Sequence, residues 1–301
     1  MRAAVFTLAQ ARTPAAALAT ALGVPLLDLV VHRFPDGELK LTLGGAAETA
    51  LLYVPLDRPG DKLLLVLMAS EALRRNGARR VVLVAPYLCY MRQDVAFHPL
   101  EAISQKVMGA MLAPALDRLV TVDAHLHRTA SLGAVFPGIE AENLTAWGVV
   151  AEALAQEKID PRTVVVGPDV ESGPLVADLA GRLGLDHAVG AKTRRGDRDV
   201  SIVFDAAASL AGRPALLIDD VVSSGGTLVE VAEALGRAGA TAIDAIVTHA
   251  LHDDETAARF VRAGIRSLRS STSVPHPSNA ISLTAMLARA LAREIAAEAT
   301  S

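Results

Sequence analysis

Two adjacent carboxylates, Asp219 and Asp220, are followed closely by a loop of small residues. Backbone N–H groups in such a loop are unblocked, and at the start of a helix they favour a phosphate. Carboxylates accept hydrogen bonds from vicinal hydroxyls, as acidic residues do on ribose. The pattern therefore favours a ribose 5-phosphate site, although a tight turn with a capping Ser or Thr is the alternative. The loop consists of Ser223, Ser224, Gly225, Gly226 and Thr227.

A strand and a helix must position this loop. The apolar run 216–218 is typical of a buried parallel strand. Residues 227–236 have apolar side chains at helical spacing and end in glycine, which predicts a helix. The loop is not a P-loop, because no Gly-Lys-Ser or Gly-Lys-Thr follows its glycines.

Polar clusters follow or interrupt other predicted strands, and ligands in open α/β sheets bind at the carboxyl ends of strands. Each cluster alone has an ordinary explanation, such as a turn, a solvated surface run or a hairpin. The cationic cluster at 192–197 could instead be a flap over bound anions. The clusters are 34–38, 90–94, 122–127, 166–172 and 192–197.

Strand and helix patterns alternate along the chain, which predicts an α/β fold. We expect two similar domains, 1–142 and 143–301, each a mostly parallel sheet flanked by helices. The predicted strands are 3–8, 26–31, 80–86, 118–122, 163–166, 187–192, 199–204, 216–218 and 242–248. The predicted helices are 14–22, 63–76, 102–116, 147–156, 173–183, 227–236, 255–263 and a C-terminal helix from Leu283.

The composition excludes several classes of function. The 301 residues include 29 basic and 33 acidic side chains, so the net charge of −4 does not suggest a nucleic-acid or membrane partner. Only 3% of residues are aromatic, which argues against base-stacking surfaces. A single cysteine, Cys89, fits a reducing compartment, and we expect a cytoplasmic location.

The order of the motifs resembles that of ribose-phosphate diphosphokinase, also called phosphoribosyl pyrophosphate synthetase, over nearly the whole chain. The residues that carry the resemblance are Phe34-Pro-Asp-Gly-Glu38, Pro86 to Asp94, Ala102-Ile-Ser-Gln-Lys106, Val122-Asp-Ala-His125, Pro168-Asp169, Lys192-Thr-Arg194, Asp219-Asp220 with Ser223 to Thr227, and Val247-Thr-His249.

The resemblance implies two phosphoribosyltransferase-like domains and transfer of a diphosphoryl group from ATP to ribose 5-phosphate. It also implies Mg²⁺ as cofactor, and a chain that assembles into a homo-oligomer, a dimer or larger. ATP would be bound by Phe34, Asp36, Gly37, Glu38, Arg92 and Gln93. Mg²⁺ would be bound by His125 and Asp169, and Lys192 and Arg194 would be catalytic. Ribose 5-phosphate would be bound by Asp219, Asp220, Ser223, Ser224, Gly225, Gly226 and Thr227.

Several residues depart from the family pattern. Ser223-Ser224 replaces Asp-Thr, Glu171 is an extra acid, and 95–101 replaces an Arg-rich stretch. These departures suggest a divergent member of the family. Two alternatives remain open: a plain phosphoribosyltransferase that uses the same loop, and a non-catalytic homologue that regulates a synthetase.

Overall fold

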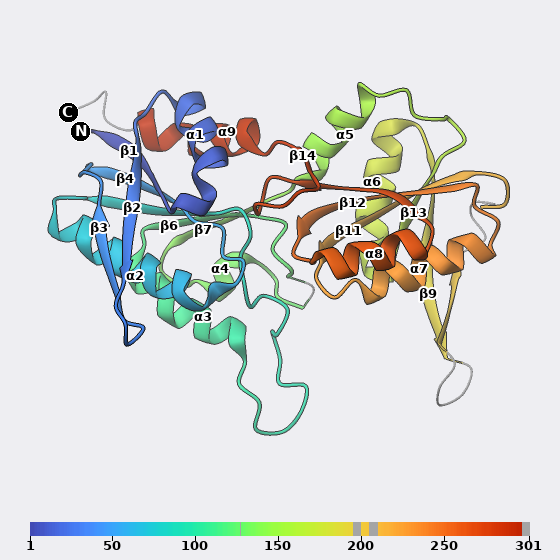
Figure 1. Cartoon of the computed structure of the whole chain (residues 1–301), viewed down its shortest axis with the longest axis horizontal. Coiled ribbons are helices and arrows are strands. Elements are labelled where there is room, and N and C mark those ends of the chain that lie inside the picture. Colours follow the sequence, from blue (N-terminus) through green and yellow to red (C-terminus); the bar gives the residue numbers. More distant parts are fainter. Residues whose placement is uncertain (127, 195–199, 205–209, 297–301) are drawn as a thin grey trace. The chain divides into compact units, whose positions relative to one another are not determined.

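The computed structural model describes residues 1–126, 128–194, 200–204 and 210–296, and it forms two compact units (Figure 1). Unit 1 comprises Met1–Thr145, Thr272–Pro275 and the described chain from Leu283. Unit 2 comprises Ala146–Ser271 and His276–Ser282. Among the described residues, no helix combines the length and the apolar character needed to cross a bilayer.

Unit 1 contains a seven-stranded sheet in the order β3-β2-β1-β4-β5-β6-β7. Neighbouring strands are parallel except β2 and β3, which form an antiparallel hairpin. The strands are β1 Ala3–Thr7, β2 Leu26–Arg33, β3 Leu39–Leu43, β4 Thr49–Tyr53, β5 Arg80–Ala85, β6 Arg118–Val122 and β7 Glu140–Leu144. The helices are α1 Arg12–Leu22, α2 Pro59–Arg75, α3 Ser104–Leu112, α4 Leu132–Val135 and α9 Thr284–Ala296, with short 3₁₀ turns at Ala9–Ala11 and Ala113–Ala115.

Unit 2 contains a second seven-stranded sheet in the order β10-β9-β8-β11-β12-β13-β14. Only the pair β9 and β10 is antiparallel. The strands are β8 Val164–Gly167, β9 Asp186–Arg194, β10 Val200–Phe204, β11 Pro214–Val222, β12 Ala242–Ala250, β13 Ile265–Ser271 and β14 Asn279–Ile281. The helices are α5 Trp147–Ala155, α6 Gly173–Leu183, α7 Gly226–Arg237 and α8 Asp254–Arg262, with a 3₁₀ turn at Val170–Ser172.

Continuous apolar runs form the central strands of both sheets, because helices cover both faces and leave no solvated side. In β5, all residues from Val81 to Ala85 are fully buried. In β11, Leu217 is also fully buried and pairs with Val166 of β8 and Ala245 of β12. The predicted fold class, two domains with mostly parallel sheets flanked by helices, is confirmed.

The sequence did not predict strands β3, β4, β7, β13 and β14. In β3, half-buried and exposed residues alternate, so the strand has no continuous apolar run. Strand β11 is also longer than the predicted 216–218, and Asp219 and Asp220 lie within it. The pairing of β11 with β12 continues past both acids to Val222, which explains the longer strand.

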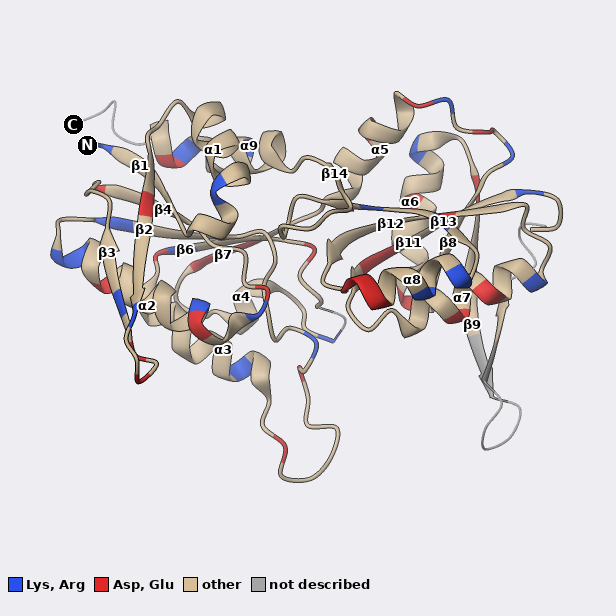
Figure 2. Ribbon diagram, in the orientation of Figure 1, with Lys and Arg blue, Asp and Glu red and all other residues tan. Residues whose placement is uncertain are grey.

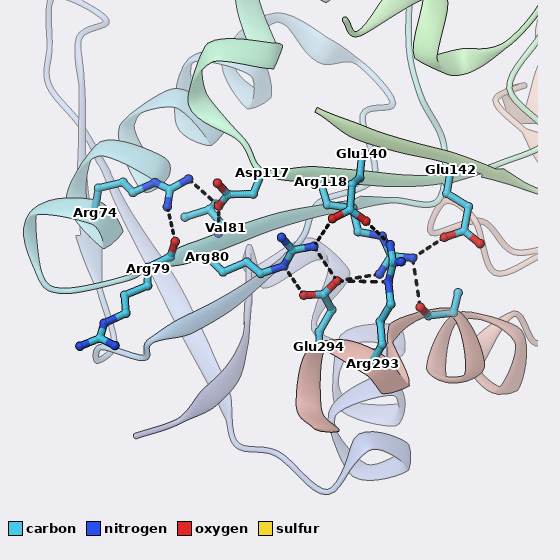
Figure 3. Close-up of polar contacts among 11 residues, drawn as sticks. Arg74, Arg79, Arg80, Val81, Asp117, Arg118, Glu140, Glu142, Arg293 and Glu294 are labelled. Atoms are coloured by element: carbon cyan, nitrogen blue, oxygen red, sulfur yellow. Dashed lines mark hydrogen bonds and ion pairs between the residues drawn. The ribbon is translucent and has the colours of Figure 1, made fainter. Parts of the chain in front are cut away.

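Helix α9 packs on unit 1, although chain order had assigned it to the second predicted domain, 143–301. It lies beside α1 (Figure 1). Arg118 of β6 and Glu294 of α9 form an ion pair at 2.8 Å, and each side chain is only 2% exposed (Figure 3). Arg80 of β5 also binds Glu294. These contacts, with the buried apolar face of α9, hold the helix on unit 1.

Candidate functional site

The carboxyl ends of β8 and β11 bring three acids to one edge of the sheet in unit 2. Asp169 follows β8 after one proline, and β8 pairs directly with β11. Asp219 and Asp220 lie near the carboxyl end of β11, just before the small-residue loop. Figure 2 shows acidic residues along β11 in red. The predicted ribose-binding acids and one predicted metal ligand therefore share this edge.

The electrostatics of this edge follow from burial and from repulsion between like charges. Burial raises the pKa of Asp219 well above its ordinary value, and the negative charge of Asp220 raises it further. The charge of Asp169 acts in the same direction. The backbone N–H of Asp220 donates to Asp219 Oδ1 at 2.9 Å, which partly offsets the rise. Such an edge favours a cation or groups that donate hydrogen bonds.

The small-residue loop joins β11 to α7 through a glycine that no other residue could replace without strain. Gly225 has φ of +72°, in the left-handed region that favours glycine. A Cβ added there would lie 2.5 Å from Cε1 of Phe260 and 2.7 Å from Cγ2 of Thr256. The N-cap residue of α7 is Gly225, which has no side chain to cap the helix. This geometry suits an anion at the helix N-terminus.

Lys192 and Arg194 lie near the end of β9, where the backbone pairs with β10. Lys192 pairs with Ile202, and Arg194 with Val200. The positions of both side chains, and of residues 195–199, lie outside what the structure describes. The cationic cluster 192–197, interpreted as a possible flap, therefore begins on β9, which pairs with the antiparallel strand β10.

In unit 1, the predicted ATP loop Phe34–Glu38 is the turn of the β2–β3 hairpin. The backbone closes the turn, since Phe34 N–H donates to Glu38 O and Gly37 N–H to Phe34 O, both at 2.9 Å. Arg33 Nη1 donates to Gly37 O at 3.1 Å. Phe34 is 38% exposed, so it is available for contact with a planar ligand.

The loop after β5 carries Arg92, Gln93 and Asp94, and it lies next to the loop after β6. The Arg128 guanidinium donates to both carboxylate oxygens of Asp94, at 2.8 to 3.2 Å. These hydrogen bonds lower the pKa of Asp94, and the charge of His125 contributes in the same direction. Gln93 is held by Ser104, whose hydroxyl donates to Gln93 Oε1 at 2.5 Å. The Arg92-Gln93-Asp94 motif and His125 therefore lie close together.

The predicted ATP ligands follow two strands that are not neighbours in the sheet of unit 1. Phe34 follows β2 and Arg92 follows β5, and strands β1 and β4 lie between these two. Three strand spacings correspond to about 14 Å. Two side chains that sandwich one ring must lie about half that distance apart.

The two predicted metal ligands belong to different units, His125 to unit 1 and Asp169 to unit 2. Within the described ranges, no group of three or more His, Cys, Asp or Glu residues is arranged to hold a metal ion. Asp169 Oδ1 accepts a hydrogen bond from Ser172 N–H at 3.1 Å, as a helix cap. The oxygen-rich edge of Asp169, Asp219 and Asp220 nevertheless offers the ligand type that Mg²⁺ prefers.

Sequence reasoning missed Arg128. Its guanidinium also lies 5.4 Å from the centre of the Phe97 ring, a cation–π contact that joins the two loops. An isolated arginine in a loop has no spacing pattern. The sequence indicated only that Asp94, the acid of the Arg92-Gln93-Asp94 motif, could pair with a cation from elsewhere in the chain.

Comparisons with known proteins agree along most of the chain. Residues 3–115 match the model of the N-terminal domain of ribose phosphate pyrophosphokinase, and residues 141–282 match the phosphoribosyl transferase domain. The ribose-phosphate pyrophosphokinase of Methanopyrus kandleri is 30% identical over 276 residues, 91% of this chain and 93% of the relative. That of Rhizobium meliloti is 32% identical over 302 residues, 96% of each chain.

The fold is also similar to a solved structure. The crystal structure of phosphoribosylpyrophosphate synthetase from Mycobacterium smegmatis superposes with a TM-score of 0.84. The match covers 97% of this chain and 98% of the other, at 23% sequence identity. It supports the two-domain architecture over the full length.

Proposed function

The chain belongs to the ribose-phosphate pyrophosphokinase family, and from this premise we propose how its residues transfer a diphosphoryl group from ATP to ribose 5-phosphate. The products are 5-phosphoribosyl 1-diphosphate and AMP. The observation that carries the site assignment is the edge of unit 2, where Asp219 and Asp220 precede a glycine-rich helix start.

Ribose 5-phosphate binds at this edge. The 5-phosphate accepts hydrogen bonds from the backbone N–H groups and hydroxyls of Ser223 to Thr227, at the positive end of α7. The ribose hydroxyls donate to the carboxylates of Asp219 and Asp220. Hydrogen bonds from these donors offset the burial and the repulsion by Asp220 that raise the pKa of Asp219.

ATP binds on unit 1 through Asp36, Gly37, Glu38, Arg92 and Gln93, with the adenine between Phe34 and Arg92. Since β1 and β4 separate the strands that lead into the two clusters, we propose that the hairpin of one copy and the Arg92-Gln93-Asp94 loop of another form the sandwich. We therefore keep the prediction of a homo-oligomer, dimer or larger. Sedimentation of the purified chain measures its oligomeric state.

The reaction needs placement and charge neutralisation more than covalent chemistry from the protein. The anomeric hydroxyl attacks the β-phosphorus of ATP in line, and AMP leaves. Lys192 and Arg194 meet the negative charge that grows on the transferred group. We propose that His125 and Asp169 would hold Mg²⁺, which would neutralise charge on phosphate oxygens. The paired strands β9 and β10 carry the two cations and exclude water.

Two observations favour this activity over the alternatives. A plain phosphoribosyltransferase would not need the N-terminal unit, whereas residues 3–115 match the synthetase-specific model. A regulatory homologue would be expected to have lost the flap cations or the acid pair, and this chain keeps all of them. We also keep the prediction of a cytoplasmic location, which a buried, unpaired Cys89 supports.

Phosphorus NMR of the purified protein with ATP, Mg²⁺ and ribose 5-phosphate tests the activity. A 1-diphosphate signal that grows together with AMP is the expected result. If ATP stays intact, the synthetase activity is refuted, and titration with phosphoribosyl pyrophosphate then asks whether the loop binds that compound as a transferase would.

Replacement of Asp219 by Asn should weaken ribose 5-phosphate more than ATP. Asn keeps the size of the side chain but loses the charge that strengthens hydrogen bonds from the sugar. A hydrogen bond to a charged group is worth about 1.5–3 kcal/mol, so KM for ribose 5-phosphate should rise roughly 10- to 100-fold. Steady-state kinetics with each substrate varied in turn measure both values.

The matched control is Asp178→Asn, which removes an exposed carboxylate on α6 of the same unit. Neither KM should change in the control. A larger effect of Asp219→Asn on ATP than on ribose 5-phosphate would mean that the two sites are assigned the wrong way round.

A further inference from the structure

Helix α8 packs against the small-residue loop at Gly225. The side chains of Phe260 and Thr256 occupy the space that a Cβ on Gly225 would need. The helix is anchored at its start, where Asp253 Oδ1 accepts a hydrogen bond from Thr256 N–H at 2.9 Å. The His252 ring meets Phe260 edge to face, with centroids 5.1 Å apart. Helix α8 is therefore a fixed support for one side of the loop.

Arg259 extends this support to the backbone of the loop. Its Nη1 donates to the carbonyl oxygen of Ser224 at 3.0 Å, a contact between residues 35 apart in the chain. The Ser224–Gly225 peptide unit is planar, so its C=O and N–H bonds point in opposite directions. With the carbonyl held toward Arg259, the N–H of Gly225 must point away from α8. An N–H with that orientation is available to a phosphate.

We propose that Arg259 is a positioning residue for the 5-phosphate, which acts through the Ser224–Gly225 peptide. This inference rests on the proposed function, since it takes the loop as the phosphate site. Arg259 fixes the rotation of a peptide that glycine alone would leave free, because Gly225 populates several backbone conformations at similar energy. The guanidinium is a stronger donor to the carbonyl than a neutral group would be.

The same helix provides a matched comparison. Arg259 and Arg262 both lie in the last turn of α8, where either cation interacts favourably with the helix dipole. Arg259 is partly buried, whereas Arg262 is exposed. A general effect of charge or helix stability would be shared by both residues. An effect through the loop belongs to Arg259 alone.

The test compares the wild type with Arg259→Ala, Arg259→Lys and Arg262→Ala. It measures kcat, KM for ribose 5-phosphate and for ATP, and calorimetric binding of ribose 5-phosphate. We expect Arg259→Ala to raise KM and Kd for ribose 5-phosphate about tenfold, with KM for ATP within about twofold. Arg259→Lys keeps a long side chain with a donor at its end and should recover most of the loss. Arg262→Ala should match the wild type.

Two results would overturn the proposal. One is an unchanged affinity of Arg259→Ala for ribose 5-phosphate in an active, folded enzyme. The other is a rise in KM for ATP as large as the rise in KM for ribose 5-phosphate, because the effect would then not act through the phosphate loop. A further variant, Gly225→Ala, tests the premise that the loop binds the 5-phosphate. If this variant bound ribose 5-phosphate as tightly as the wild type, the loop would not be the phosphate site. Thermal unfolding of each variant verifies that it is folded.

Discussion

Replacement of Lys192 by alanine is expected to lower kcat by roughly three orders of magnitude, with only a modest loss of ATP affinity. A cation that meets the charge of a phosphoryl-transfer transition state is worth roughly 10³–10⁵ in rate in related chemistry, or about 4–7 kcal/mol. The charge develops only as the bond to the leaving group breaks, so the loss should appear in kcat. Initial rates of AMP formation at saturating substrates measure it.

The variant should fold normally, because the pairing of Lys192 with Ile202 uses the backbone of β9 and β10. Lys192→Arg, which keeps the charge, should retain much more activity than the alanine variant. Lys158→Ala removes an exposed lysine elsewhere in unit 2 and should leave kcat unchanged. Unchanged turnover in Lys192→Ala would remove this residue from the mechanism.

Replacement of Glu294 by alanine is expected to destabilise unit 1 by about 3 kcal/mol at neutral pH. The change leaves Arg118 buried and without its partner on α9, and loss of one member of a buried pair typically costs 3–5 kcal/mol. Arg118 keeps Glu142 and the carbonyl of Ala290, so the lower end of that range is expected (Figure 3). Urea denaturation of the full chain, monitored by circular dichroism, measures the change.

The destabilisation should depend on pH in a defined direction. Burial raises the pKa of Glu294, but hydrogen bonds from Arg80 and Arg118 outweigh burial, and the net pKa lies below the ordinary value. A carboxyl with a lowered native pKa contributes stability above its unfolded pKa, about 4.3, and loses that contribution as pH falls through the native value. The difference between wild type and Glu294→Ala should therefore shrink in acid.

A control in the same unit is Glu71→Ala, which breaks an exposed pair with Arg75 on α2. Such pairs contribute little, so the change should stay below about 0.5 kcal/mol. A double variant, Arg118→Met with Glu294→Leu, should be less destabilised than Glu294→Ala, since no charge is left buried. If Glu294→Ala were as stable as the wild type at neutral pH, the pair would not hold α9 on unit 1.

The sequence by itself determined the central strands and most helices of this protein. Runs such as Val81 to Ala85 favour buried strands because they are short and rich in β-branched residues. The helix Gly173–Leu183 matches its predicted bounds. The order of short motifs also predicted the family, because each motif is a local pattern of residue types. Local patterns are set by neighbours in the chain, so they can be read without a structure.

The tertiary structure decided the features that depend on distant contacts. Arg118 and Glu294 are 176 residues apart, and no local pattern indicates that they pair. Packing between elements likewise produces the hydrogen bonds from Arg259 to the Ser224 carbonyl and from Arg128 to Asp94. The raised pKa of Asp219 depends on burial and on the charges that β8 and β11 bring together. Such interactions exist only once the sheets have assembled, because spatial proximity, and not residue type, determines them.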